Sequence, residues 1–506
     1  MILANGLIRT LDPHVPTQRA LAIAGEFVAG GVGVHETALA SPDVLDLGGR
    51  VVVPGFTDSH VHFPTWALAQ TEVALDGCAS LDEALERIRG VELQPGRWLR
   101  GYGWRSGDWD PRREPTRHDL DPITGDTPAG LIAKDYHSLW LNSAALALAH
   151  GDLDVQGGVV ERDATGEPTG VLREEAAWHF KERHMIVPDS DYLDAMRSGV
   201  RLANARGVTA VHDKDGWLGA LRLWQQLEER GHLTLRVWQS IPHDGLDAAA
   251  KVGLRSGIGS PHLKLGYLKV FMDGTLGSQT AWLLDGTGVQ ITSGAELAEI
   301  VRRGAEAGFP VSVHAIGDRA NREALDAFEQ TKNVWGPLGL RQRIEHAQLL
   351  APDDVARFGE LGVACSVQFS HAPSDRDLAD AYWAGKTGGA YAYRSLLDSG
   401  AVVANGSDAP IEELDPLAGI RAGVRRTIDD RPPWHPEQCL TVEEAFQATC
   451  VTPAWLEYAE RKRGTLIPGH YADLVVLDRD PFDDLDAQVV ATMVGGRFVH
   501  NPPPWD

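Results

Sequence analysis

Cysteine is scarce in this chain of 506 residues, which contains only Cys78, Cys365, Cys439 and Cys450. They form no Cys-x-x-Cys pair, which argues against a disulfide framework and against a cysteine-based zinc site. Long hydrophobic runs are also missing, so we expect no membrane-spanning segment. The first twelve residues lack the basic start and apolar run of a secretory signal, so we expect a cytoplasmic protein.

Basic residues are the minority among the charged ones. Lys and Arg number 47 against 71 Asp and Glu, which gives a formal net charge of −24. This balance argues against nucleic-acid binding, which needs a basic surface, and against binding to an anionic membrane. Hydrophobic residues make up 43%, which is enough for a sizeable core and excludes global disorder. The length exceeds that of one ordinary domain.

The stretch around which the chain is organised is 51–63, VVVPGFTDSHVHF. Its apolar, β-branched beginning predicts a buried strand, and Pro54 with Gly55 marks a break in the backbone. His60 and His62 follow at a spacing of two, which on a strand places both imidazoles on one face. Such a pair suits a transition metal, most often zinc. A polar turn with hydrogen-bonded histidines would have the same pattern, so the choice between a turn and a metal site depends on the rest of the chain.

The middle of the chain alternates short β-branched runs with helix-like segments such as 294–307. Together with the opening stretch, the candidate strands number eight, and this alternation predicts a (β/α)8 TIM barrel. A doubly wound open sheet is the alternative, but no Gly-x-Gly-x-x-Gly opens a helix after an early strand. The other seven candidate strands are 208–212, 233–239, 263–271, 309–314, 343–346, 363–368 and 401–405.

Both ends of the chain are rich in short strands and turns, which predicts a small β-sandwich domain built from residues 1–52 and 463–506. The barrel then comprises 53–65 and 186–462. The long interval between the first two barrel strands predicts an inserted subdomain, 66–185, over the barrel mouth. This insert is rich in tryptophan, and we expect it to set specificity. Its aromatic side chains could line a substrate pocket or form the insert's own core.

Polar residues recur at the ends of the predicted barrel strands, where TIM-barrel active sites lie. His60 and His62 follow the first strand, and Asp408 follows the last. The strands between them supply Lys269 and Asp273, then His314, then His346, at spacings that fit βα units. Each alone is weak evidence, and Asp408 could be a helix N-cap before Pro410. Together they predict one polar rim with four histidines, a lysine and a carboxylate.

Several motifs resemble a known family. The segment 53–62, VPGFTDSHVH, resembles the signature of the amidohydrolase superfamily. Other motifs resemble the branch that includes N-substituted formamide deformylase, so the resemblance covers nearly the whole chain. These motifs are 101–104 (GYGW), 137–143 (HSLWLNS), 269–278 (KVFMDGTLGS), 313–319 (VHAIGDR), 344–348 (IEHAQ), 406–410 (GSDAP) and 469–474 (GHYADL).

The resemblance implies roles for the rim residues. His60 and His62 would bind one metal ion together with Asp408, and His314 and His346 would bind a second. Lys269, carboxylated, would bridge them in a binuclear centre that holds one or two divalent ions, most typically zinc, although these ligands also accept iron, manganese or nickel. Asp408 would also act as the general base. Candidate substrate-binding residues are Trp104, His137, Asp273, Gln368 and His371, where 367–371 (VQFSH) departs from the branch's usual proline after the glutamine.

The function implied by the resemblance is a metal-dependent hydrolase that cleaves a C–N bond, amide or N-acyl, of a small molecule with a metal-bound hydroxide. Relatives are often homodimers. One alternative is an aminohydrolase (deaminase) of the same superfamily. Such enzymes lack the bridging lysine and usually carry a glutamate three residues after the strand-five histidine, where this chain has Gly317. The other alternative is a non-catalytic relative. Such relatives lose metal ligands, and none is missing here.

Overall fold

A computed structural model describes residues 1–30, 43–94 and 96–505, so part of the predicted segment 1–52 lies outside the description. The chain separates into two compact units. One comprises Met1–Phe63 and Arg197–Asp506, and the other comprises Pro64–Met196. Within the described residues, no helix combines the length and apolar character needed to cross a membrane.

The first unit contains the barrel. In the described part of the chain, eight strands pair side by side and in parallel, in the order β21-β20-β19-β18-β17-β16-β15-β8. This arrangement confirms the predicted fold class. The strands are β8 (Phe56–Val61), β15 (Val208–Asp213), β16 (Arg236–Pro242), β17 (Leu263–Phe271), β18 (Val311–Ala315), β19 (Arg343–His346), β20 (Ala364–Val367) and β21 (Val403–Asn405).

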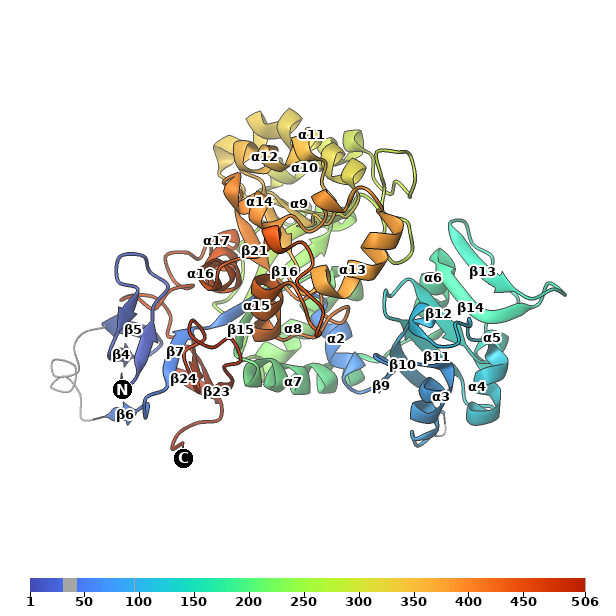
Figure 1. Cartoon of the computed structure of the whole chain (residues 1–506), viewed down its shortest axis with the longest axis horizontal. Coiled ribbons are helices and arrows are strands. Elements are labelled where there is room, and N and C mark those ends of the chain that lie inside the picture. The colour runs from blue at the N-terminus through green and yellow to red at the C-terminus, as the bar shows by residue number, and fades with distance from the viewer. Residues whose placement is uncertain (31–42, 95, 506) are drawn as a thin grey trace. The chain divides into compact units, whose positions relative to one another are not determined.

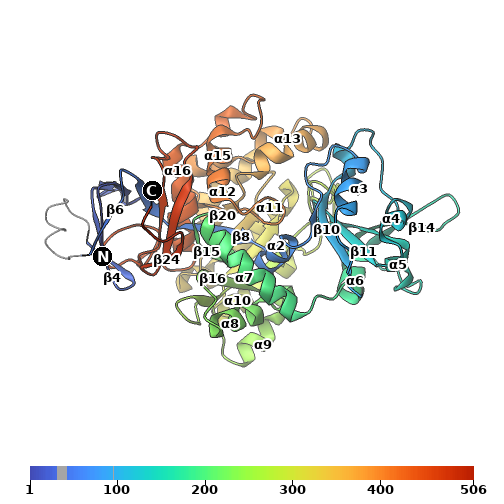
Figure 2. The ribbon, with the colours of Figure 1, turned by 90° about the horizontal axis from the view of Figure 1, so that it is seen from below.

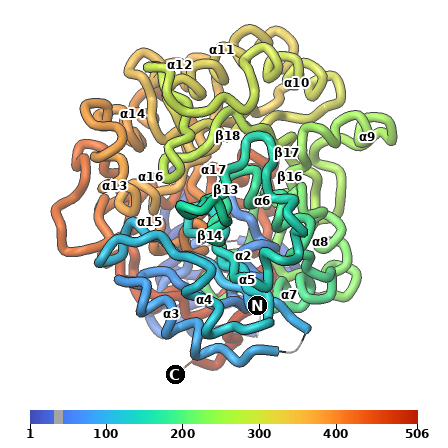
Figure 3. The backbone as a smooth tube through the Cα atoms, turned by 90° about the vertical axis from the view of Figure 1, so that its right-hand side faces the viewer, coloured from blue at the N-terminus to red at the C-terminus, as the bar shows by residue number. Residues whose placement is uncertain are grey.

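Helices follow the strands around the outside of the barrel, and Figure 3 shows α8, α10, α11, α12 and α14 succeeding one another there. The predicted helix 294–307 is confirmed as α10, whose ends are set by a Ser293 capping box and by Gly308 at φ +78°. The helices of this layer are α8 (Ala220–Glu229), α9 (Leu246–Lys251), α10 (Gly294–Ala307), α11 (Asp318–Trp335), α12 (Pro352–Leu361), α13 (His371–Tyr382), α14 (Tyr393–Asp398), α15 (Pro416–Arg425), α16 (Val442–Phe446) and α17 (Thr452–Leu456).

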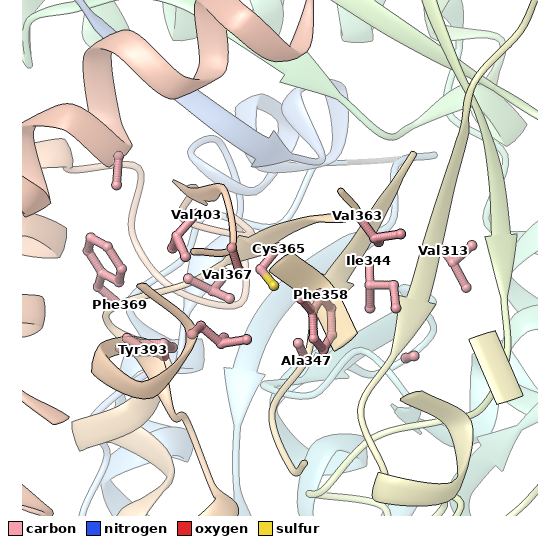
Figure 4. Close-up of a cluster of buried hydrophobic side chains, with 14 of the residues drawn as sticks. Val313, Ile344, Ala347, Phe358, Val363, Cys365, Val367, Phe369, Tyr393 and Val403 are labelled. Carbon is pink, nitrogen blue, oxygen red and sulfur yellow. The ribbon is translucent and has the colours of Figure 1, made fainter. Parts of the chain in front are cut away.

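Alternation along the strands sorts apolar from polar side chains. Val313 and Ile344 belong to the core cluster that also contains Phe358 of α12 (Figure 4). The neighbours of Ile344, Arg343 and Glu345, instead reach β8 across the barrel interior, through Ser59 and His60. Because successive side chains of a strand point to opposite faces, the apolar set packs outward against the helices, and the polar set faces inward.

Strands from both chain ends form the terminal domain and lie side by side (Figure 1, Figure 2). Among the described residues, one sheet has the order β24-β23-β22-β7-β2-β3 and the other β5-β4-β1-β6. Leu3, Leu21, Val52 and Val476, contributed by both sheets, share one core cluster. The strands are β1 (Ile2–Ala4), β2 (Leu7–Arg9), β3 (Thr17–Gln18), β4 (Leu21–Ala24), β5 (Phe27–Gly30), β6 (Val44–Asp46), β7 (Val51–Pro54), β22 (Leu474–Leu477), β23 (Val489–Val494) and β24 (Arg497–His500).

The apolar run at 51–54 is buried as predicted, but it is not the first barrel strand. As β7 it pairs in parallel with β2 and antiparallel to β22, inside the terminal sheet. The barrel strand β8 starts after Gly55, where an added Cβ would lie 2.3 Å from the Thr209 side chain. The break at Pro54 and Gly55 therefore separates a strand of the terminal sheet from the first barrel strand, and β7 crosses the predicted boundary at 52.

The second unit has its own sheet, in the order β13-β14-β12-β11-β10-β9 among the described residues. Trp104 is 2% exposed, shares a core cluster with Trp109 and Trp140, and donates from Nε1 to the Leu131 carbonyl at 2.8 Å. These contacts favour the alternative in which Trp104 belongs to the insert's own core. The elements are α2 (Phe63–Ala69), β9 (Val73–Ala74), α3 (Leu81–Arg89), β10 (Leu99–Trp104), α4 (Arg117–Thr124), β11 (Ala129–Ala133), β12 (Ser138–Leu141), α5 (Ser143–Ala147), β13 (Gly158–Arg162), β14 (Pro168–Glu174), α6 (Glu175–His184) and α7 (Asp189–Ala205), which continues into the first unit.

Candidate metal centre

The predicted rim residues lie at the carboxyl ends of the barrel strands. His60 is on β8 and His62 directly follows it, while Lys269 is near the end of β17. His314 is on β18, and His346 is the last residue of β19. Asp408 lies three residues after β21. In a parallel barrel these ends meet at one rim, which is where catalytic groups of this fold lie.

His60, His62 and Asp408 form the tightest group. One ligand atom from each lies within 4.8 Å of the others. Asp408 Oδ1 is 3.3 Å from His60 Nε2 and 3.5 Å from His62 Nε2. Two imidazole nitrogens and a carboxylate oxygen at this separation can converge on one divalent cation.

Asp58, which was not among the predicted site residues, connects the first barrel strand to the loop that carries Asp408. Its carboxylate accepts hydrogen bonds from Ser407 N at 3.0 Å, from Ser407 Oγ at 2.5 Å and from His60 N at 3.1 Å. Asp408 N in turn donates to the His60 carbonyl at 2.7 Å. Gly406 permits this approach, since an added Cβ would lie 2.4 Å from His60 N. Asp58 lies two residues before His60 in the signature segment 53–62, and this position was the sequence signal that could have identified it.

Asp408 is not a helix N-cap, because α15 starts only at Pro416 and is capped by Asp415. Its backbone has φ +60°, in the left-handed region that non-glycine residues seldom adopt. Such a conformation persists only where surrounding contacts impose it, and it is found most often at functional sites. Here the bonds from Ser407 to Asp58 and from Asp408 to His60 impose it.

The four predicted histidine ligands each have one nitrogen facing a hydrogen-bond acceptor. His60 Nδ1 lies 2.8 Å from Glu345 Oε2, and His62 Nδ1 lies 2.7 Å from Asp215 Oδ1. An acceptor fixes the proton on the facing nitrogen, so the other nitrogen presents its lone pair. The remaining two pairs are His346 Nδ1 with Gln368 Oε1 at 2.8 Å and His314 Nε2 with Gly274 O at 3.1 Å.

The structure brings together only part of the predicted ligand set for the second metal ion. The rings of His314 and His346 are 4.6 Å apart between centroids. The second compact group of potential ligands, however, contains His346, His371 and Asp408, without His314. His371 Nε2 is 3.9 Å from Asp408 Oδ2, and its Nδ1 faces Gln348 Nε2 at 3.0 Å. His371 therefore lies within the rim. A donor amide faces its ring, whereas acceptors face the four predicted histidine ligands.

Lys269 is 1% exposed, and its Nζ lies 4.7 Å from the centroid of the Phe271 ring. Burial lowers the pKa of Lys269 to about 8, although Glu345 and Asp408 oppose that shift. Within residues 1–30, 43–94 and 96–505, Lys269 Nζ has no hydrogen-bond partner. A buried, unpartnered amine with a lowered pKa is the form that can take up carbon dioxide.

Glu345 is the centre of a buried ion network beneath the rim, which sequence reasoning missed. Its Oε1 lies 2.7 Å from Arg343 Nε and 2.9 Å from Lys214 Nζ, and it also accepts from Ser312. Its Oε2 holds His60. Burial opposes ionisation of Glu345, but the charges of Arg343 and His60 outweigh it and hold its pKa well below the usual value. The position next to His346 was a signal, but three of its four partners, Lys214, Ser312 and His60, come from distant segments of the chain.

The carboxylates of the rim call for a compensating positive charge. Burial favours a neutral His62, but Asp215 and Asp408 outweigh it and raise its pKa to about 10. Burial likewise opposes ionisation of Asp408, yet His60 and His62 hold its pKa well below the ordinary value. A divalent cation bound between these groups would supply this charge.

Three of the other predicted substrate-binding residues make hydrogen bonds within the protein. Asp273 accepts from the backbone amides of Trp282, Ile316 and Gly317 at 2.8–3.0 Å, which pins the loops after β17 and β18. Gln368 orients His346, as described above. His137, in the other unit, has its Nδ1 2.7 Å from Glu174 Oε2. Each contact occupies only part of the polar groups concerned, and substrate binding by these three residues stays a prediction.

The donor set fits a divalent metal ion. His60 Nε2 is buried without a hydrogen-bond partner among the described residues, although its lone pair points toward Asp408. A buried polar atom left unpaired is costly, and a bound cation would satisfy it. Imidazole nitrogens with carboxylate oxygens are ligands for zinc and for several other divalent ions.

Comparisons with known proteins agree with this geometry. A model of the amidohydrolase family matches residues 43–500. The protein YtcJ of Bacillus subtilis is 30% identical over 503 residues, covering 93% of this chain and 94% of its own. N-substituted formamide deformylase of Arthrobacter pascens is 28% identical, with 98% and 97% covered. The crystal structure of a metal-dependent hydrolase from Pyrococcus furiosus superposes with a TM-score of 0.77 at 30% identity, covering 95% of this chain and 99% of that one.

Proposed function

The chain is a metal-dependent hydrolase of the amidohydrolase family, and on this premise we propose that it hydrolyses the C–N bond of an amide or N-acyl small molecule. The observation that carries the proposal is the convergence of His60, His62 and Asp408 at the carboxyl ends of β8 and β21. Full-length similarity to N-substituted formamide deformylase supports the choice of bond.

His60, His62 and Asp408 would hold one ion, and His346, with Lys269, His314 or His371, would supply ligands for a second. A divalent ion bound there polarises a carbonyl group and lowers the pKa of a water molecule. Glu345 and Asp215 hold Nδ1 of the His60 and His62 rings, which leaves each Nε2 facing Asp408, where it would be available to an ion.

Asp408 is the group placed to move a proton. Its lowered pKa favours the ionised carboxylate, its side chain is 10% exposed, and it faces three of the four predicted histidine ligands. A carboxylate oxygen left free can accept the proton of the attacking water and pass it to the leaving nitrogen. Because its pKa is low, Asp408 is a weak base, and the transfer requires a water molecule that has itself been made acidic.

The aminohydrolase alternative meets a steric obstacle at Gly317. Related deaminases usually carry a glutamate at the corresponding position. Here an added Cβ would lie 2.1 Å from the Trp282 carbonyl oxygen, and Gly317 N donates to Asp273 at 2.8 Å. No side chain fits at Gly317 without moving that backbone, which favours amide hydrolysis over deamination.

Purified protein is expected to contain between one and two divalent metal ions per chain by elemental analysis. It should release amine or ammonia from at least one member of a panel of simple formamides, acetamides and N-acyl amino acids. Chelation should abolish this activity, and added zinc should restore it. Full activity in metal-free protein would contradict the proposal, and tight metal binding without turnover would favour the non-catalytic alternative.

Lys269→Ala is expected to lose activity together with at least one bound metal ion, because a carboxylated Lys269 would supply anionic oxygen ligands. Partial rescue by a short carboxylic acid such as formate would indicate the carbamate. Lys264→Ala, on the same strand but partly exposed, is the matched control and should keep its metal. Normal metal content in Lys269→Ala would exclude Lys269 as a ligand.

A further inference from the structure

Trp217 is a large aromatic side chain that remains 49% exposed. It lies in a short 3-10 turn, η2 (Gly216–Leu218), just beyond the carboxyl end of β15 and two residues after Asp215, which holds His62. Indole rings are more often buried, so an exposed one beside a candidate active site calls for a functional explanation.

The turn that carries Trp217 is held firmly. Leu218 N donates to the Asp215 carbonyl and Gly219 N to the Gly216 carbonyl, at 3.2 and 3.1 Å. Gly216 packs so closely on the end of β16 that an added Cβ would lie 2.7 Å from Pro242 Cδ. Trp217 is therefore presented from a fixed backbone, which makes it a preorganised contact surface.

Aromatic rings connect Trp217 to the candidate metal centre. The Trp217 and Phe271 rings are 5.4 Å apart between centroids at 51°. Phe271, the last residue of β17, is partly buried, and its ring is 5.0 Å from that of His314. Ring contacts thus run from the exposed Trp217 through Phe271 to His314.

The rim is open on the side of Trp217. The His62 side chain is 28% exposed, whereas those of His60 and His346 are 1% and 4% exposed. A substrate whose scissile bond reaches Asp408 therefore has its protruding part near His62, Asp215 and Trp217. Flat apolar groups bind well against indole and phenyl faces, because stacking adds to the burial of apolar area.

We propose that Trp217 and Phe271 form an apolar subsite that binds an aromatic or bulky hydrophobic substituent of the substrate. The inference rests on the proposed function and names the substrate class, which is an amide with such a group on its acyl or nitrogen side. Trp217 determines specificity in this subsite, since it covers the substituent from the solvent side without touching the scissile bond.

Binding of two phosphonates to the zinc-loaded protein tests the subsite. Phosphonates mimic the tetrahedral form of a carbonyl under attack, and benzylphosphonate differs from methylphosphonate by one phenyl ring. Isothermal titration is expected to give tighter binding of benzylphosphonate to the wild type. Trp217→Ala should lose about tenfold in benzylphosphonate affinity, the amount expected for one lost apolar side-chain contact. Its methylphosphonate affinity and zinc content should not change.

Two further variants sharpen the comparison. Trp217→Phe retains an aromatic face and should keep most of the preference for the benzyl probe. Leu338→Ala is the matched control, because Leu338 is 58% exposed in the turn before β19, at the amino-terminal end of the strands. It should leave both affinities unchanged. A wild type without preference between the probes would overturn the inference, as would a loss in Trp217→Ala that is equal for both.

A kinetic comparison separates this inference from the proposed function. With N-benzylacetamide and N-methylacetamide as substrates, Trp217→Ala should raise KM for the benzyl amide about tenfold and leave kcat nearly unchanged. If neither amide is hydrolysed while the phosphonate preference depends on Trp217, the subsite stands and the amide proposal fails. If both amides are hydrolysed equally well by the wild type and by Trp217→Ala, the subsite is wrong and the amide proposal stands.

Discussion

Asp408→Asn is expected to lower kcat by at least the factor of about 10² that is typical when a general base is lost. Asparagine keeps the shape of the side chain and one acceptor oxygen, but it removes the charge and the basicity. Asp408 lies 3.3–3.9 Å from a ring nitrogen of each of His60, His62, His346 and His371. The measurement is steady-state turnover of the best amide from the panel, together with metal content by elemental analysis.

The metal content distinguishes the two roles of Asp408. If it is mainly a base, most of the histidine-held metal remains in Asp408→Asn while turnover collapses. Loss of turnover in proportion to lost metal would assign it only the role of ligand. Near-normal kcat would remove Asp408 from the mechanism. Asp415→Asn is the matched control, because Asp415 caps α15 and asparagine caps a helix about as well.

Glu345→Gln is expected to lower the free energy of unfolding by about 3–5 kcal/mol, as observed when one partner of a buried ion network is removed. The substitution leaves the cations of Lys214 and Arg343 buried without their carboxylate. Both side chains are fully inaccessible to solvent, so water cannot replace the lost charge. Denaturant unfolding of the metal-free protein, followed by circular dichroism, measures this change.

A surface ion pair provides the control for this stability prediction. Glu299→Gln removes the partner of Arg302 on the exposed face of α10 and should cost less than about 1 kcal/mol. Adding Lys214→Met to Glu345→Gln should recover part of the loss, because one uncompensated cation is removed. Equal stability of Glu345→Gln and Glu299→Gln would show that the network carries no net stabilisation.

Glu345→Gln should also weaken metal binding by roughly 10–100-fold, the usual effect of removing a group that orients a histidine ligand. Glu345 holds His60 Nδ1 at 2.8 Å, and a glutamine in the same place orients the ring less strongly. Competition with a chelator measures the affinity at a temperature where the variant is folded. Unchanged affinity in a folded variant would limit Glu345 to stabilising the barrel.

The sequence by itself determined the barrel and most of its rim. The β-branched runs at 263–271 and 343–346 became β17 and β19 with the predicted bounds, because strand formation depends on local pattern and burial. Helix 294–307 was equally local, since Ser293 and Gly308 mark its ends. The positions of His60, His314 and His346 at strand ends followed from the alternation of strands and helices, which sets the rim of any parallel barrel.

Side-chain partners were decided only by the tertiary structure. Glu345 and His60 lie 285 residues apart, and Asp58 and Ser407 lie 349 apart. Closure of the barrel brings β8 beside β21 and lets Glu345 of β19 reach His60 of β8 across the interior, and no local pattern encodes these contacts. The same holds for β7, which the sequence pattern assigned to the barrel. It belongs to the terminal sheet, because its partners β2 and β22 come from the two ends of the chain. Local periodicity fixes which residues face the barrel interior, whereas the packing of distant segments fixes which groups meet there.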